Sequence, residues 1–550
     1  MSGNKLVDVC IVGAGASGLV AAKELSEAGM SVVVLERGPW YKREDFALGD
    51  EIIYKQRPFF WPTVEQEPRT WRPNAQSPTE RLSTEVQTFS NAMCVGGGTV
   101  HYSAISWRFH ESDFRVKSTD GPVAGTSIED WPITYDDMEP YYEKAEWTIG
   151  VSGKGWSSPF DPPRKRDYPL PPVARNSAGA VLDKGARALG LHPFPTPVAI
   201  LSAPYDGRDE CINKGLCSGY ACPVGAKSST LEALLPKALA TRRCDLRPLC
   251  LVREIRLDSQ GRAAGVDYFD PDGTEQFQPA RLVVLAAGGV ETPRLLLLSQ
   301  SPRFPHGLCN SSGLVGKNLM LHSPGVTLVV VFPEPLDGHQ GSSSTRVLQD
   351  FYETDTRRGF IRGGFMHPRS HGGNPIELAL RSTHGARWGL THKDSMRETW
   401  RHYLHSHCTG ESLPIESNQV DLDPEVKDCC GVPVARITHT SHENDVRLAR
   451  FLGERSREIF EAAGATKVIV PSPEIRKLHN HQMGTCRMGN DPNSSVVDKW
   501  CRSHDVSNLF IIDASVFVTS GGLNPALTIE ANAFRACDHL VAEAKRGNLR

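Results

Sequence analysis

The sequence predicts an α/β protein with a dinucleotide-binding unit of the Rossmann type and a further region that has its own sheet. Two observations predict this class. A glycine-rich turn joins an apolar strand to a helix near the start of the chain, at residues 7–28, and strand-like runs recur between residues 325 and 438. A chain of 550 residues is also too long for one ordinary core, so we expect more than one domain.

The composition excludes several classes of protein. Hydrophobic residues make up 39% and charged residues 23% of the chain, which excludes a disordered, collagen-like or coiled-coil protein. Lys and Arg number 61 against 64 for Asp and Glu, so no basic excess indicates nucleic acid or an anionic membrane as a partner. The longest apolar runs are too short to span a bilayer, and no signal-peptide pattern precedes the first strand. We therefore expect a cytoplasmic protein with mostly reduced cysteines and no direct membrane insertion, and export on a partner's signal stays open.

The first element is the strand at residues 7–12, which leads into the sequence GAGASG at residues 13–18. In such a GxGxxG turn, the first glycine permits the tight turn and the second lets the backbone approach a pyrophosphate. The third glycine lets the following helix pack on the strand, and the helix N-terminus offers free N–H groups to the phosphates. The residues that we expect to contact a dinucleotide here are Gly13, Gly15, Ala16, Ser17 and Gly18.

A second apolar strand, residues 31–35, ends at Glu36. Glu36 follows Gly18 by 18 residues, close to the spacing of ~20 at which an acid accepts hydrogen bonds from ribose hydroxyls. An acid here disfavours a 2′-phosphate by charge repulsion. We count Arg37 with Glu36 among the cofactor-binding residues. The motif alone does not separate NAD from FAD.

Four later segments carry more specific information. They are a second glycine-rich loop (91–102), a buried strand with a glycine turn and a helix start (285–296), the sequence HQMGTCRMG (481–489), and LFIIDAS with NPALT (509–515 and 524–528). In this order, together with the N-terminal motif, they resemble the glucose–methanol–choline (GMC) oxidoreductases from end to end. The sequences VGGGTVHY and WRFHESDF are most similar to the sugar-oxidising branch, which holds gluconate and fructose dehydrogenase large subunits, pyranose oxidases and glycoside oxidases.

The resemblance implies FAD as the cofactor and an architecture of two domains. It implies a Rossmann-type FAD-binding domain built from discontinuous segments, and a substrate domain with a large, mainly antiparallel sheet. We place the FAD-binding segments at 1–120, 206–320 and 476–550, a covering segment at 121–205, and the substrate domain at 321–475. Strands are expected at 325–332, 359–366, 376–381 and 432–438, and an amphipathic helix at 444–464.

Further cofactor contacts follow from the resemblance. Gly96, Gly97 and Gly98 leave room beside the flavin ring because no Cβ intrudes. His101 matches the position where pyranose oxidases attach flavin covalently, but gluconate-type dehydrogenases share this loop without the bond, so we prefer an ordinary loop histidine. The helix that starts near Thr528 would point its positive end at the ring. The other expected contacts are Thr99, Val252, Ala287, Asp513, Ala514, Asn524 and Pro525.

Two residues are expected to carry the chemistry. His481 matches the catalytic histidine of the family's H-x-x-G-T pattern, and an imidazole suits proton removal near neutral pH. His479 shares a face with His481 if the segment is extended, so spacing alone does not choose between them. Asn524 matches a position that orients the substrate oxygen through a neutral amide. Its alternative is a structural one, since Asn before Pro often forms a turn.

A cysteine-rich segment allows more than one interpretation. Cys211, Cys217 and Cys222 stand in a C-x5-C-x4-C pattern, followed by Pro223. Some sugar dehydrogenases resemble this with a C-x3-C second gap and hold a three-iron cluster. We prefer a turn with buried thiols, with an iron–sulfur cluster as the alternative, and a zinc site lacks an evident fourth ligand. No other metal is predicted, because the histidines near 402–407 and 439–442 have no supporting acid.

The predicted function is therefore an FAD-dependent oxidoreductase that oxidises a CH–OH group of a sugar, glycoside or polyol. The resemblance implies hydride transfer to flavin N5, with His481 as the base and Asn524 orienting the oxygen. The alternatives are oxidation of a non-sugar alcohol, a non-redox reaction of the hydroxynitrile lyase kind, or a flavin-binding subunit without catalysis. Oxygen or a redox partner accepts the electrons. No c-type haem motif occurs, and an oligomer is compatible with the sequence.

Overall fold

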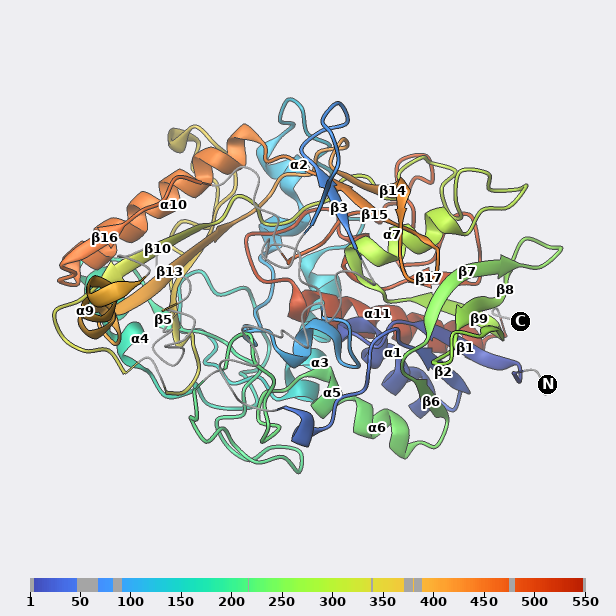
Figure 1. The fold of residues 1–550 in the computed structure, drawn as a ribbon, viewed down its shortest axis with the longest axis horizontal. Coiled ribbons are helices and arrows are strands. Elements are labelled where there is room, and N and C mark those ends of the chain that lie inside the picture. The colour runs from blue at the N-terminus through green and yellow to red at the C-terminus, as the bar shows by residue number, and fades with distance from the viewer. Residues whose placement is uncertain are drawn as a thin grey trace.

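The computed structural model of the chain describes residues 4–46, 68–82, 92–215, 217–337, 340–369, 379, 388–473 and 480–547. Two sheets dominate the molecule. A mostly parallel sheet with its helices lies at one end, beside both chain termini, and an antiparallel sheet covered by a long helix lies at the other end (Figure 1). Among the described residues, no helix combines the length and the apolar composition needed to cross a membrane.

The parallel sheet has seven strands in the order β6-β2-β1-β9-β8-β7, with β17 paired to β9. Its strands are β1 (Val7–Val12), β2 (Val32–Leu35), β6 (Cys244–Arg247), β7 (Leu251–Leu257), β8 (Ala263–Phe269), β9 (Glu275–Leu285) and β17 (Leu509–Ile511). Strands β6, β2, β1, β9 and β17 run parallel, whereas β7 and β8 are antiparallel. Every residue of β2 is buried, as expected for a parallel strand covered on both faces.

Strand β9 explains why the nucleotide-binding unit is discontinuous in sequence. Its first half pairs with β8, and its second half lies between β1 and β17. The register places Leu285 beside both Val12 and Ile511. Three segments that are far apart in the chain therefore end at one edge of the sheet, which is where ligands bind in open α/β sheets. The predicted segment limits themselves stay a prediction.

Helices cover both faces of this sheet. Helix α7 (Gly288–Leu298) packs on one face, while α1 (Ala16–Glu27), α11 (Ala526–Lys545) and α3 (Tyr135–Ile149) pack in succession on the other (Figure 1). The short helices α5 (Thr230–Ala233) and α6 (Leu235–Ala240) extend this layer. Helix α1 ends as its sequence predicts, because Gly29 follows with a φ of +93°.

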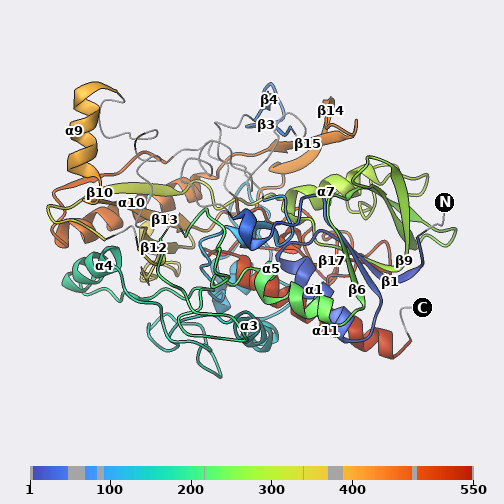
Figure 2. The same cartoon turned by 60° about the horizontal axis from the view of Figure 1, so that its bottom comes forward.

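The antiparallel sheet has the strand order β12-β13-β10-β16. These strands are β12 (Gly364–Arg369), β13 (Tyr403–Gly410), β10 (Val326–Val331) and β16 (Lys467–Ile469). Helices α10 (Glu443–Ala462) and α4 (Ser177–Ala188) pack on one another and on this sheet, and Leu448, Leu452 and Phe460 of α10 are buried (Figures 1 and 2). Four shorter elements lie outside these two sheets: α2 (Val116–Asp120), α9 (Gly389–Thr399), β5 (Phe194–Pro195) and β11 (Arg346–Val347).

The strand predictions for this region are partly wrong. The strand predicted at 325–332 is β10 (Val326–Val331), but the strand predicted at 359–366 starts only at Gly364. Gly359 and Arg362 have φ values of +73° and +63°, which an extended strand does not accommodate. The segment 376–381 lies outside the described residues except for residue 379.

The fourth predicted strand belongs to another sheet. It is β15 (Pro433–Thr438), which pairs with β14 (Gln419–Lys427) and β3 (Thr70–Arg72), and β3 pairs with β4 (Glu80–Arg81). Strand β13, which contains His405 and His407, was not predicted. The pairing of these strands joins residues that are far apart in the chain, and hydrophobic periodicity does not predict such pairings.

Candidate active site

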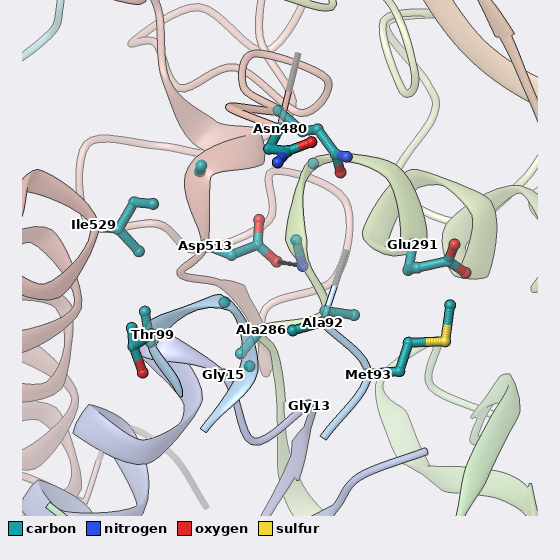
Figure 3. Close-up of a pocket in the computed structure, with 18 of the residues that line it drawn as sticks. Gly13, Gly15, Ala92, Met93, Thr99, Ala286, Glu291, Asn480, Asp513 and Ile529 are labelled. Atoms are coloured by element: carbon teal, nitrogen blue, oxygen red, sulfur yellow. Dashed lines mark hydrogen bonds between the residues drawn. The ribbon is translucent and has the colours of Figure 1, made fainter. Parts of the chain in front are cut away.

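A cavity of about 540 Å³ lies where the parallel strands end and reaches to the antiparallel sheet. It is lined by the glycine turns after β1 and β9, by the loop before α11, and by β12 and β13. Figure 3 shows part of its wall, with Gly13, Gly15, Thr99 and Asp513 around one space. All of the predicted site residues line this cavity, except Gly18, Gly96 and Thr528.

Three helix N-termini meet at the cavity. The first residues of α1, α7 and α11 all line it. Helix N-termini carry free N–H groups and a positive partial charge, so this wall favours an anionic group. Asp513 secures the start of α7, because its Oδ2 accepts hydrogen bonds from Gly288 N at 2.9 Å and from Thr292 Oγ1 at 2.6 Å (dashed line in Figure 3).

Two glycines of the cavity wall have no reason within the chain to be glycine. Gly15 and Gly98 both lack a positive φ, and a Cβ built on either would meet no atom within 4 Å. The open space lies on the cavity side, since both residues line it. A ligand that passes close to the backbone supplies the missing reason, so these residues fit a nucleotide cofactor.

The other glycines of the two loops serve the fold. A Cβ on Gly18 would lie 2.0 Å from Gly13 O, where α1 packs on the turn. A Cβ on Gly97 would lie 2.9 Å from Gly15 Cα, so the second loop rests directly on the first. Gly96 is likewise closed in by Val100, at 2.7 Å. Gly18 and Gly96 therefore shape the cavity without lining it.

Glu36 is fixed at the end of β2 as the motif predicts. Its Oε2 accepts a hydrogen bond from Ala14 N at 2.8 Å, and its Oε1 accepts one from Gly38 N at 2.9 Å. Each carboxylate oxygen keeps a further lone pair for a ribose hydroxyl. Burial raises the pKa of Glu36, and the backbone N–H groups oppose this rise. Val252 lines the same end of the cavity, beside an irregularity in the pairing of β7 with β8.

A buried cluster of charges borders this end. Glu291 binds Arg37 at 3.2 Å, Arg69 at 2.6 Å and Arg294 at 3.1 Å, and Arg294 also binds Asp428 at 2.7 Å. Despite its burial, the three guanidinium groups hold the pKa of Glu291 well below its usual range. Three arginines against two carboxylates leave one positive charge in excess. The sequence identified Arg37 alone, because Arg69 and Asp428 reach the cluster only through tertiary packing.

His481 lies at the other end of the cavity, between two partners. Its Nδ1 is 2.8 Å from Nδ1 of His322, and its Nε2 is 3.3 Å from Nδ2 of Asn524. His322 in turn places its Nε2 at 2.6 Å from Gly521 O. The sequence analysis missed His322, because no motif marks it and it lies far from His481 along the chain. His479, the alternative base, lies outside the described residues.

These contacts determine which ring nitrogens of His322 and His481 carry a proton. Gly521 O can only accept, so Nε2 of His322 carries the hydrogen. Burial lowers the pKa of His322 to about 4, so this ring is neutral and its Nδ1 is an acceptor. His481 must then donate from Nδ1. A neutral His481 therefore presents an unprotonated Nε2 to Asn524 and the cavity.

Asn524 completes this group with an open acceptor. Its Nδ2 faces the lone pair of His481 Nε2, and its Oδ1 is buried without a hydrogen-bond partner among the described residues. A buried acceptor without a partner costs about 1–3 kcal/mol. A hydroxyl of the substrate other than the one that reacts would satisfy it, since each hydroxyl donates only one hydrogen. The pair His481 and Asn524 is thus brought together at the cavity, as the sequence predicts.

The antiparallel sheet supplies the opposite wall. Phe365, His367 and Arg369 alternate along β12 and all line the cavity, and they are joined by His407 and Thr409 of β13. The register pairs Phe365 with Thr409 and His367 with His407, so these side chains share one face. Alternation within residues 364–369 is the sequence signal that would have found them.

Thr528 does not reach the cavity, whereas His101 lines it, as expected of a loop histidine near the cofactor. Thr528 lies in the first turn of α11, but its buried hydroxyl is 2.9 Å from the hydroxyl of Tyr142 and does not line the cavity. His101 is buried, lines the cavity and follows a short 3-10 turn. Burial and the charge of Lys227 lower the pKa of His101 to about 3, so its ring is neutral.

The cysteine-rich segment is organised by a lysine. The buried Nζ of Lys227 donates to the carbonyl oxygens of Tyr102, Cys217 and Tyr220, at 2.9, 2.6 and 2.6 Å. Cys211, Cys217 and Cys222 are free thiols. Within the described residues, no group of three or more His, Cys, Asp or Glu side chains could hold a metal ion. The iron–sulfur alternative is therefore not supported, and an ammonium group takes the central position in this loop.

Comparison with known proteins agrees with this geometry. Two models of the GMC oxidoreductase family match the chain, over residues 7–324 and 414–533. The 2-methyl-1,2-propanediol dehydrogenase of Mycolicibacterium austroafricanum is 36% identical over 97% of this chain and 95% of its own. The fructose dehydrogenase large subunit of Gluconobacter japonicus is 31% identical over 98% of each chain. The structure of pyridoxine 4-oxidase from Mesorbium loti superposes with a TM-score of 0.66 at 17% identity, over 97% of this chain and 98% of that one.

The chain belongs to the GMC oxidoreductase family. The predicted family, its sugar-oxidising branch and the two-part α/β fold are confirmed by these matches. The protein is an FAD-dependent oxidoreductase. The open space beside Gly15 and Gly98, the carboxylate of Glu36 and the three helix N-termini fit that cofactor.

Proposed function

We propose that the protein oxidises a CH–OH group of a sugar, a polyol or a small diol. FAD, when bound, supplies the two-electron acceptor for the hydride that leaves the carbon. Gly15, Gly98 and Glu36 would hold the cofactor along the glycine turns. The single observation that supports the chemistry best is the series of hydrogen bonds from His322 through His481 to Asn524, which ends at the cavity.

The protein's part in the reaction is to hold the alcohol and take its proton. The substrate hydroxyl would donate to Nε2 of His481 and accept from Nδ2 of Asn524, in place of their mutual contact. That contact is 3.3 Å long, at the weak end for a hydrogen bond, so exchanging it costs little. His322 keeps the Nδ1 proton in place, which leaves Nε2 as the basic atom. Proton removal by such a positioned base contributes about 10²–10⁴-fold to a rate.

The substrate class rests on the relatives and on the wall of the cavity. The relatives named above act on a diol and on fructose, so both small diols and sugars are candidates. Imidazole, guanidinium and hydroxyl groups from β12 and β13 offer several hydrogen bonds to a polyhydroxylated molecule. A non-sugar alcohol stays the second candidate, because the diol dehydrogenase shares the highest identity among the relatives named here.

Anaerobic spectroscopy of the FAD-loaded protein tests this proposal. We expect the flavin absorbance to bleach with at least one member of a panel of sugars, polyols and 1,2-diols. His481→Ala should retain flavin yet slow bleaching by about 10²-fold or more. The exposed His306 provides a matched control, since His306→Ala should bleach at the wild-type rate.

Other results would contradict the proposal. If no alcohol bleaches the flavin while dithionite does, the protein is not an alcohol oxidoreductase, and a non-redox reaction or a subunit role takes precedence. If His481→Ala bleaches at the wild-type rate, His481 is not the base. The rate of recovery in air would then identify oxygen or another molecule as the electron acceptor.

A further inference from the structure

Arg369 brings a positive charge into the cavity that the proposed reaction does not use. It is the last residue of β12 and lines the cavity on the same face as Phe365 and His367. Its Nε is buried without a hydrogen-bond partner among the described residues, and its Nη2 donates to the hydroxyl of Ser218. No carboxylate of the described residues forms an ion pair with it.

Two of the most deeply buried arginines among the described residues are neutralised by carboxylates. Arg108 binds the carboxylates of Glu139 and Glu146, and Arg362 binds those of Asp113 and Glu411. Buried arginines are rarely left without such partners, because an uncompensated charge in a low-dielectric site is costly. Arg535 is also buried and forms no ion pair among the described residues, but it donates to Lys499 O and Asn532 Oδ1. Arg369 instead lines the cavity with neither a carboxylate nor a partner for its Nε among the described residues.

The surroundings of Arg369 do not compensate its charge. Burial lowers the pKa of His367 well below its usual range, so this ring is neutral. Burial also raises the pKa of the Cys217 thiol, which keeps it protonated near neutral pH. Burial lowers the pKa of Arg369 to about 10, so the guanidinium is still charged at neutral pH. This wall of the cavity thus presents a net positive charge to whatever enters.

We propose that Arg369 binds an anionic oxygen group, a carboxylate or a phosphate, carried by the alcohol substrate. The inference rests on the proposed function and narrows it to acidic polyols, such as sugar acids or sugar phosphates. A guanidinium is planar and offers several N–H donors in a fork that matches the oxygens of either group. The same charge disfavours an ammonium-bearing substrate by repulsion. Arg369 would act as a specificity-determining residue and would take no part in the proton transfer at His481.

A charge series with one carbon skeleton tests this inference. Gluconate, sorbitol and glucamine share a six-carbon chain and differ in charge at one end, and sorbitol 6-phosphate places a phosphate there instead. Methyl glucoside and methyl glucuronide form the corresponding pair with a sugar ring. Flavin bleaching by each compound would be measured without oxygen, for the FAD-loaded wild type, Arg369→Gln and Arg369→Lys.

We expect the wild type to prefer an anionic member over its neutral partner by at least about 10-fold in the reduction rate constant divided by the apparent Kd, and to use glucamine least. Whether the carboxylates or sorbitol 6-phosphate react best identifies the anion. Arg369→Gln should lose about 10- to 100-fold with the anions, mostly in the apparent Kd, and stay within about twofold with the neutral compounds. Arg369→Lys should fall between the two, since it keeps the charge without the fork.

The controls separate this inference from the proposed function. Arg357→Gln removes an exposed arginine and should change none of the rates. Equal loss with anionic and neutral compounds in Arg369→Gln, or a wild type that prefers sorbitol or glucamine, would overturn the role of Arg369 and leave alcohol oxidation standing. Bleaching by no compound of either skeleton, nor by the wider panel of alcohols, would overturn both.

Discussion

The hydrogen bonds that link Gly521, His322, His481 and Asn524 predict different rates of flavin reduction for two variants at His322. His322→Leu removes the acceptor for the Nδ1 proton of His481. His322→Gln keeps both functions, because its amide oxygen can accept from His481 while its amide N–H donates to Gly521 O. His322 has a φ of +51°, and the two replacements bear this backbone conformation alike, so its cost cancels in the comparison.

The size of the effect follows from the contact that is lost. The bond between the two Nδ1 atoms is 2.8 Å long, and a buried N–H without an acceptor costs about 1–3 kcal/mol. That energy now favours moving the proton to Nε2 or turning the ring, and either change removes the basic lone pair from the cavity. We expect flavin reduction in His322→Leu to slow by about 10- to 100-fold, with substrate binding nearly unchanged.

The assay is stopped-flow reduction of the FAD-loaded protein without oxygen, at several substrate concentrations. His322→Gln should stay within about threefold of the wild type, and thermal unfolding would show whether either variant is destabilised. Equal rates in His322→Gln and His322→Leu would refute the proton-positioning role and reduce His322 to a packing residue. A wild-type rate in His322→Leu would show that the hydrogen bond between His322 and His481 does not contribute to the reaction.

Three further outcomes are expected. Gly15→Ala should fold normally, because its backbone is unstrained and the new methyl meets no protein atom, yet bind FAD at least about 10-fold more weakly by equilibrium dialysis; unchanged affinity would mean that no ligand occupies that space. Glu291→Gln should destabilise the apoprotein by about 3–5 kcal/mol in urea unfolding, since three arginines lose their shared carboxylate, and a loss below about 1 kcal/mol would contradict this. Burial raises the pKa of Glu530 from 4.5 to about 8, so the folded state holds a proton that the unfolded state releases, and stability falls as pH rises from 4.5 to 8 by up to about 5 kcal/mol. Glu530→Gln should therefore exceed the wild type in stability at pH 8 but barely at pH 5, and an equal difference at both pH values would argue against the raised pKa.

Local signals predicted the nucleotide-binding half well. The strand, the glycine turn and the acid at Glu36 are close in sequence, and each constrains the backbone within a few residues. The segments around Asp513 and Asn524 came from motif resemblance, and the structure brings both to the cavity. Their meeting depends on β9, which pairs with β1 and β17 at once. No local pattern specifies that double pairing.

The substrate half was harder to predict for physical reasons. Arg362 adopts a left-handed conformation, which no propensity for the sequence around it suggests, and it delays the start of β12. The register of β12 against β13 sets the alternation by which His367 and Arg369 face the cavity. A shift of one residue would have turned both side chains away. Which side chains of β12 line the cavity therefore depends on a backbone detail that only the folded chain shows.

One short loop, the segment before α11, contacts both His322 and His481. Gly521 O accepts a hydrogen bond from Nε2 of His322, and Nδ2 of Asn524 contacts Nε2 of His481. The loop is held closely on both sides: a Cβ on Gly521 would lie 2.9 Å from the ring of Phe109, and one on Gly522 would lie 2.7 Å from Gly363 O. Gly521 and Asn524 therefore belong to one tightly packed loop. Helix α11, which follows this loop, packs between α1 and α3. A displacement of this loop would shift Gly521 O and the amide of Asn524 together, so the position of the base relative to its substrate partner is preserved.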